Sequence, residues 1–138
     1  MNDEAVVPIR SDGDIVTARQ EGRALASLLG FSSTEATLIA TAISELARNI
    51  VLYAKRGEIV LALVEDHGRR GIVVTARDEG PGIVDVRKAL MDGHSTSGGL
   101  GLGLPGVRRL MDDFEIVSQI GKGTTVTVKR WKQGAGPV

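Results

Sequence analysis

One long amphipathic segment, residues 32–56, constrains the fold of this chain more than any other feature. It begins with Ser32 and Glu35 at the spacing of a capping box, and Gly57 follows it as a helix stop. Apolar residues recur through it every three or four positions, at Ile39, Ala42, Ile43, Leu46, Ala47, Ile50 and Ala54. This spacing predicts an α-helix with one apolar stripe, which other parts of the chain must cover.

The segments around this helix predict several strands and further helices. Runs rich in β-branched and other apolar residues indicate strands at residues 6–9, 59–64, 72–76, 114–118 and 124–129. Apolar periodicity and helix-starting residues indicate helices at residues 12–29, 85–91 and 105–112. Residues 65–71 and 121–123 are typical of hairpin loops. We therefore expect an α+β two-layer sandwich, in which helices cover one face of a mixed, mostly antiparallel sheet.

Length and composition indicate an ordinary globular domain over residues 1–138, with a flexible tail at residues 133–138. The chain has no cysteine, which excludes disulfides and thiolate metal sites and fits a reducing compartment. Its 17 basic residues balance 17 acidic ones, so overall charge favours neither nucleic acid nor an anionic membrane as a partner. No apolar run approaches the ~20 residues of a membrane span, and the N-terminus lacks the apolar core of a signal peptide. We expect a cytoplasmic protein.

Glu45 and Asn49 form the first candidate site. They lie one helical turn apart, and both point away from the apolar stripe of the predicted helix. A carboxylate can orient or deprotonate a hydroxyl group or a water molecule, and an amide oxygen is a ligand suited to Mg²⁺. An ordinary polar helix face explains the pair equally well, so the pair alone does not establish a site.

The second candidate is the sequence Asp78-Glu79-Gly80-Pro81-Gly82, which follows a predicted strand. A carboxylate at a strand end can accept a hydrogen bond from an exocyclic amine such as that of adenine. The two glycines would let a flat ring approach the backbone. A plain turn after a strand is the alternative explanation.

The third candidate is the glycine-rich segment at residues 98–106, which precedes a predicted helix. Backbone N–H groups in such a loop, together with a helix N-terminus, can hold phosphate groups. The segment also matches the dinucleotide-binding fingerprint, but no strand precedes it and no acidic residue follows at the required distance, so we reject that interpretation. The downstream motifs of two-lobed protein kinases are missing from the sequence as well.

Together, these motifs resemble the Bergerat ATP-binding fold of the GHKL superfamily. The residues that carry the resemblance are Glu45-x-x-x-Asn49, Asp78-x-Gly80-x-Gly82, the glycine-rich lid, and a late Gly-Thr-Thr ending in Thr125. Each motif is weak alone, but the four motifs in this order are highly specific. Residues 41–50 and 92–107 narrow the resemblance to the RsbT-type switch-protein kinases of bacterial stress signalling, over essentially the whole chain.

The resemblance implies ATP and Mg²⁺ as cofactors and a role for each motif. Asn49 would hold Mg²⁺ against the phosphates of ATP, and Glu45 would act as the general base on the incoming hydroxyl group. Asp78 would recognise the amino group of adenine. The other expected ATP contacts are Gly80, Gly82 and Thr125 beside the base, and Gly98, Gly99, Leu100, Gly101, Leu102 and Gly103 in the lid over the phosphates.

The resemblance further implies a serine/threonine protein kinase that phosphorylates STAS-domain scaffold and antagonist proteins of a stressosome. Such a kinase then binds and activates a PP2C-type phosphatase. Two alternatives stay open. An anti-sigma factor kinase that sequesters a sigma subunit would use the same ATP site with a different docking surface. A non-catalytic switch would use the nucleotide only to control lid closure and partner choice, although the presence of Glu45 argues against it.

Overall fold

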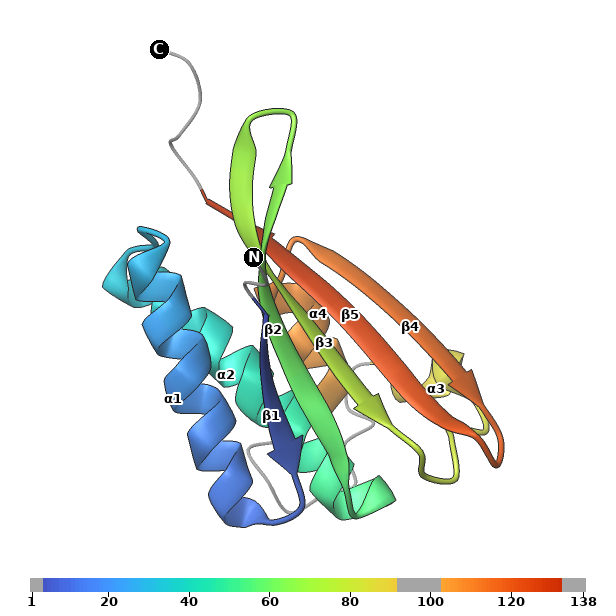
Figure 1. The fold of residues 1–138 in the computed structure, drawn as a ribbon. Coiled ribbons are helices and arrows are strands. Elements are labelled where there is room, and N and C mark those ends of the chain that lie inside the picture. The colour runs from blue at the N-terminus through green and yellow to red at the C-terminus, as the bar shows by residue number, and fades with distance from the viewer. Residues whose placement is uncertain (1–3, 92–102, 133–138) are drawn as a thin grey trace.

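A computed structural model of the chain describes residues 4–91 and 103–132. Five strands form one sheet in the order β1-β2-β3-β5-β4 (Figure 1). Their bounds are Ala5–Ile9 (β1), Gly57–Asp66 (β2), Arg69–Asp78 (β3), Asp113–Gln119 (β4) and Gly123–Trp131 (β5). The α+β class is confirmed. The prediction of a mixed sheet is wrong in one detail. All the neighbouring strand pairs are antiparallel, and none is parallel among the described strands. The predicted flexible tail lies outside the described residues.

The connections between the strands explain the antiparallel pairing. Hairpins join β2 to β3 and β4 to β5. Between β1 and β2 the chain runs out through helix α1 (Asp12–Leu28) and back through helix α2 (Ser33–Asn49). It therefore re-enters the sheet at the end where β1 stops, with Ile9 opposite Gly57. A parallel pair would instead need a crossover that returns the chain to the opposite end.

The helices cover one face of the sheet, as expected (Figure 1). Beside α1 and α2 they include the short α3 (Val86–Ala89) and α4 (Gly103–Leu110), which has Pro105 in its first turn. The predicted capping box starts α2. The Glu35 N–H group donates to Ser32 Oγ at 3.1 Å, and the Ser32 N–H group donates back to Glu35 Oε1 at 3.4 Å.

The end of the long helix differs from the prediction. The α-helix does not continue to Arg56 but gives way after Asn49 to a π-helical turn, η1 (Ile50–Ala54). Each π turn holds an extra residue, so side chains after Ile50 rotate away from the stripe expected for an α-helix. Ile50 stays buried, whereas Leu52 and Tyr53 are about half exposed. Apolar periodicity cannot predict this change.

The core forms where the apolar stripe of α2 meets the inner face of the sheet. Side chains alternate between the two faces along each strand. The buried inward-facing residues include Ile9 on β1, Ile59 and Leu61 on β2, Ile72, Val74 and Ala76 on β3, and Val126 and Val128 on β5. The stripe residues Ile39, Ala42, Ile43, Leu46, Ala47 and Ile50 belong to the same cluster. This alternation also decides which polar residues of the strand ends face the helices.

The β2–β3 hairpin is longer than predicted. The strands reach Asp66 and Arg69, which leaves only His67 and Gly68 in the turn instead of residues 65–71. Both turn residues have positive φ angles, 52° and 81°, as a two-residue type I′ turn requires. Opposite charges face each other near the turn, with Arg70 Nε 3.6 Å from Glu65 Oε2. Cross-strand pairs of this kind stabilise charged strand ends that composition alone assigns to a loop.

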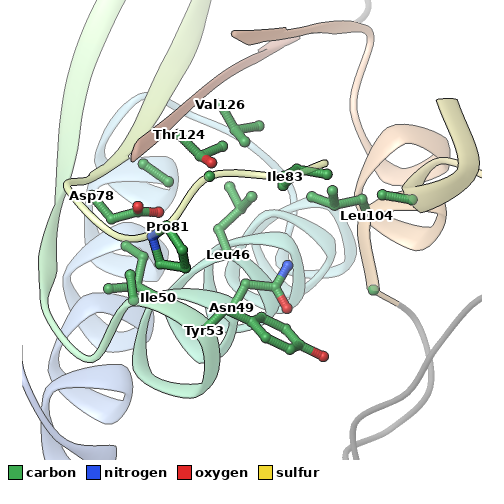
Figure 2. Close-up of a pocket in the computed structure, with 15 residues that line it drawn as sticks. Leu46, Asn49, Ile50, Tyr53, Asp78, Pro81, Ile83, Leu104, Thr124 and Val126 are labelled. Atoms are coloured by element: carbon green, nitrogen blue, oxygen red, sulfur yellow. The ribbon is translucent and has the colours of Figure 1, made fainter. Parts of the chain in front are cut away.

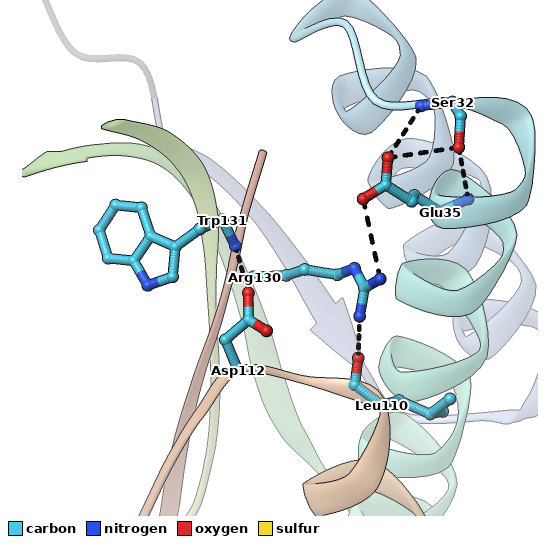
Figure 3. A network of polar contacts seen from close by, with 6 residues as sticks. All are labelled: Ser32, Glu35, Leu110, Asp112, Arg130 and Trp131. Atoms are coloured by element: carbon cyan, nitrogen blue, oxygen red, sulfur yellow. Dashed lines mark hydrogen bonds and ion pairs between the residues drawn. The ribbon is translucent and has the colours of Figure 1, made fainter. Parts of the chain in front are cut away.

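Arg130 joins β5, α4 and α2 at the end of the sandwich where β5 stops (Figure 3). From β5, Arg130 donates through Nη1 to the carbonyl of Leu110 at 2.6 Å, at the last residue of α4. Its Nη2 lies 3.7 Å from Glu35 Oε2, in the capping box of α2. The next residue, Trp131, donates its backbone N–H to Asp112 at 2.7 Å. These contacts hold the C-terminus of α4 against the sheet.

Candidate functional site

A cavity of about 330 Å³ lies between the helices and the inner face of the sheet, at the end where β3 stops and β5 starts (Figure 2). α2, η1 and the start of α4 form one side, and β3, β5 and residues 81–83 form the other. Its walls are mainly apolar and include Leu46, Ile50, Ala76, Ile83, Leu104 and Val126. Polar groups of Asn49, Tyr53, Asp78 and Thr124 also line it. An apolar pocket with a few polar groups is typical of a small-molecule site.

Asp78 and Thr124 form a polar pair at one end of this cavity. They lie directly opposite each other on the neighbouring strands β3 and β5 and face the same side of the sheet. Asp78 Oδ1 accepts a hydrogen bond from the backbone N–H of Gly80 at 2.9 Å. That contact fixes the carboxylate and leaves Oδ2 without a hydrogen bond among the described residues. The pair can therefore recognise a ligand edge that carries a donor.

The structure corrects the prediction for Thr125. This residue pairs with Arg77 and lies on the outer face of the sheet, away from the cavity. Its neighbour Thr124 faces the cavity instead. The reason is the alternation of strand side chains, because Val126 and Val128 point into the core and Thr124 shares their face. Counting back in steps of two from Val128 along the strand predicts that Thr124, and not Thr125, faces the helices.

Asn49 lines the cavity, whereas Glu45 does not and instead contacts the start of α4. Asn49 is half-buried and lines the cavity at the end of α2 (Figure 2). Glu45 lies one turn earlier and is only 3% exposed, so it is not part of a solvent-facing polar surface. Its Oε1 accepts a hydrogen bond from the backbone N–H of Gly103 at 3.3 Å. Among the described residues its Oε2 has no hydrogen bond, and Arg48 Nε lies 3.9 Å from it.

The environment of Glu45 is unusual for a structural residue. Buried polar atoms in native proteins nearly always have hydrogen-bond partners, and exceptions call for an explanation. Only Ser44 accompanies it among the buried polar or charged side chains of residues 4–91 and 103–132, and the Ser44 hydroxyl donates to the Ala40 carbonyl at 2.9 Å. Glu45 Oε2 is therefore a buried acceptor that none of the described residues satisfies.

Gly80 and Gly82 allow close packing of the loop that follows β3. A Cβ atom on Gly80 would lie 2.6 Å from Cβ of Ala54, so the loop packs against η1 only with glycine there. Gly82 has a φ angle of +82° and packs against the backbone of Gln119. Of the two, only Gly82 also lines the cavity. These glycines position the loop that closes one side of the site.

Most of the predicted lid, namely Gly98, Gly99, Leu100, Gly101 and Leu102, lies outside the described residues. Gly103, the last lid residue, is the first residue of α4 and lines the cavity. Tyr53, Ile83 and Leu104 also line it, and none of the sequence motifs marks them as site residues. Within residues 4–91 and 103–132 no cluster of three His, Cys, Asp or Glu side chains could hold a metal ion. No described helix is both long and apolar enough to cross a membrane.

Comparison with known proteins places this chain in a family. The sequence profile described as a histidine kinase-like ATPase domain matches residues 9–130. The serine/threonine-protein kinase RsbT of Bacillus subtilis (strain 168) is 53% identical over 131 residues, which cover 95% of this chain and 98% of that protein. The chain belongs to the RsbT family of histidine kinase-like ATPase domains.

Other relatives of this RsbT-family kinase are more distant. The anti-sigma F factor of Geobacillus stearothermophilus is 30% identical over 122 residues, or 82% of this chain and 81% of that protein. A crystal structure of the RsbU and RsbW domains of a Mycobacterium tuberculosis protein superposes with a TM-score of 0.68 at 21% identity. That alignment covers 99% of this chain and 35% of the longer protein, and it confirms the fold. The chain is a serine/threonine protein kinase that uses ATP.

Proposed function

We propose that this RsbT-family kinase binds Mg²⁺·ATP in the cavity and transfers the γ-phosphoryl group to a serine or threonine of a STAS-domain regulatory protein. The observation that carries the proposal is the pair of Asp78 and Thr124 at one end of an apolar cavity, with Asn49 on the opposite, helical side. A nucleotide has the matching shape, since its base is flat and largely apolar and its phosphates are anionic.

The base occupies the end formed by the strands. The apolar side chains of Ile50, Ile83 and Val126 contact its faces, and Asp78 Oδ2 accepts a hydrogen bond from the amino group of adenine. Asp78 is held in place by the Gly80 N–H group, so binding does not have to order it. The start of α4 at Gly103 lies on the phosphate side, where a helix N-terminus favours anions.

Asn49 holds Mg²⁺ through its amide oxygen. Mg²⁺ is usually bound by only one or two protein ligands, and phosphate oxygens and water complete its shell. A single oxygen ligand beside the cavity fits this requirement, and bound Mg²⁺ neutralises charge on the phosphates.

Glu45 receives the proton of the attacking hydroxyl group. Its Oε2 has no hydrogen bond to any described residue, whereas its Oε1 accepts one from the Gly103 N–H group. Because Glu45 is 3% exposed, a substrate hydroxyl reaches it only after this contact opens. Phosphoryl transfer then depends on positioning and charge neutralisation more than on covalent help from the protein.

The names of the relatives support a proposal for the wider function. The B. subtilis protein carries the name RsbT, and the M. tuberculosis structure joins RsbW and RsbU domains in one chain. We infer that this kinase acts by partner switching, in which it leaves a phosphorylated STAS-domain complex and activates a PP2C-type phosphatase. The second candidate is an anti-sigma factor kinase, because anti-sigma F factors match over 82% of the chain.

The test combines the purified chain, Mg²⁺·ATP and STAS-domain proteins encoded in the same genome, with mass spectrometry to locate added phosphate. Glu45→Gln and Asp78→Asn are the test variants, and Glu79→Gln is the matched control because this neighbouring carboxylate is exposed and does not line the cavity. We expect one phosphorylated serine or threonine, lost in both test variants and kept in the control. ATP binding without transfer to any STAS protein, but with capture of a sigma subunit, would favour the second candidate.

A further inference from the structure

Ser118 on β4 contacts two residues that line the same side of the cavity, Ile83 and Thr124, although it does not line the cavity itself. Its Oγ accepts a hydrogen bond from the backbone N–H of Ile83 at 2.7 Å. It lies 2.8 Å from the Thr124 hydroxyl and 3.4 Å from the Gly123 carbonyl oxygen. Ile83 and Thr124 both line the cavity (Figure 2). Ser118 is therefore placed to act on the ligand through Thr124.

The proton of Ser118 has two competing acceptors. A hydroxyl group has one proton, and Ser118 Oγ already accepts from Ile83, so the proton goes either to Gly123 or to Thr124. The Thr124 contact of 2.8 Å is an ordinary O–H···O distance, whereas 3.4 Å to Gly123 lies beyond the usual range. The distances favour donation from Ser118 to Thr124.

This direction leaves the proton of Thr124 available to the ligand. Thr124 then presents a donor to the cavity, and Asp78 beside it presents an acceptor. Adenine carries the complementary edge, with a donor at its 6-amino group and an acceptor at N1. Guanine carries an acceptor at O6 and a donor at N1. Its O6 would face the acceptor of Asp78, and its N1–H would face the donor of Thr124. A site built to pair with specific polar groups rejects an analogue that leaves them unpaired.

We propose that Ser118 is a specificity-determining residue, which fixes Thr124 as a hydrogen-bond donor and thereby makes the kinase select adenine over guanine nucleotides. The inference rests on the proposed nucleotide site. Ser118 acts through Thr124 and does not touch the nucleotide. When Ser118 is absent, the Thr124 hydroxyl is free to rotate and can donate or accept, so the discrimination against guanine at Thr124 is lost and only the mismatch at Asp78 remains.

The test measures the affinities of ADP and GDP, by competition with a fluorescent ADP analogue, for wild type, Ser118→Ala and Thr125→Val. Thr125 lies on the outer face of the same strand and serves as the control. We expect Ser118→Ala to lower the ratio of ADP to GDP affinity by about tenfold, the effect of one neutral hydrogen bond, and Thr125→Val to leave it unchanged. A loss of loop packing alone would weaken both nucleotides equally, and an unchanged ratio would overturn the inference.

A ligand change tests the same hydrogen bond independently. 1-Deaza-ADP lacks the N1 acceptor, so it should bind wild type about tenfold more weakly than ADP and bind Ser118→Ala with a smaller loss. Thr124→Val removes the same donor while Ser118 stays in place, so 1-deaza-ADP and ADP should bind this variant equally well. This variant keeps the test valid if Ser118→Ala fails to fold. Equal losses in all three proteins would refute the role of Ser118. Failure of the wild type to bind ADP would instead refute the proposed nucleotide site.

Discussion

Asp78→Asn separates nucleotide recognition from folding. The asparagine side-chain oxygen can still accept the hydrogen bond from Gly80, which Asp78 Oδ1 receives at 2.9 Å, so the loop keeps its anchor. An NH₂ group replaces Oδ2 and meets the amino group of adenine with a second donor. The lost charge-assisted hydrogen bond is worth about 1.5–3 kcal/mol, which corresponds to a roughly 10- to 150-fold weaker Kd for ATP.

Isothermal titration with ATP and ADP measures this change, and thermal unfolding of the free protein checks the fold. Glu79→Gln removes the same charge from the next residue, which is exposed and lies outside the cavity. We expect the control to bind within about twofold of wild type and the Tm of Asp78→Asn to shift by less than about 3 °C. If Asp78→Asn binds as tightly as the control, the recognition of adenine by Asp78 is refuted.

Three further predictions concern the site and its supports. Thr124→Val should weaken ATP binding about 3- to 10-fold in the same titration, whereas Thr125→Val on the outer face should have no effect; equal losses would contradict the assigned faces. Gly80→Ala places a Cβ atom 2.6 Å from Ala54, so we expect a loss of about 1–3 kcal/mol in urea unfolding together with weaker ATP binding; a variant as stable as wild type would argue against this close packing. Arg130→Met removes the 2.6 Å bond to the C-terminus of α4 and should lower the Tm by roughly 5–10 °C; an unchanged Tm would show that the network of Figure 3 adds no stability.

Local patterns in the sequence predict much of this fold. The capping box of Ser32 and Glu35 and the stripe around Ile43 depend only on residues close together in the chain, and both are present in the structure. The strands are predicted in the right places but too short at the β2–β3 turn, because paired charges of opposite sign extend both strands. Asp78 could be predicted as a cavity residue because it follows a predictable strand, and Asn49 because it lies off the apolar stripe of a predictable helix.

The sequence by itself therefore determined the helix and strand segments, the antiparallel hairpins and the polar residues that end beside the cavity, since periodicity and turn residues act over a few positions. Only the tertiary structure decided the π turn after Asn49, the burial of Glu45 against Gly103 and the contact of Ser118 with Thr124. Glu45 and Gly103 are 58 positions apart, and such a contact exists only after α2 and α4 have packed together. Packing of the whole chain sets these contacts, and no local pattern encodes them.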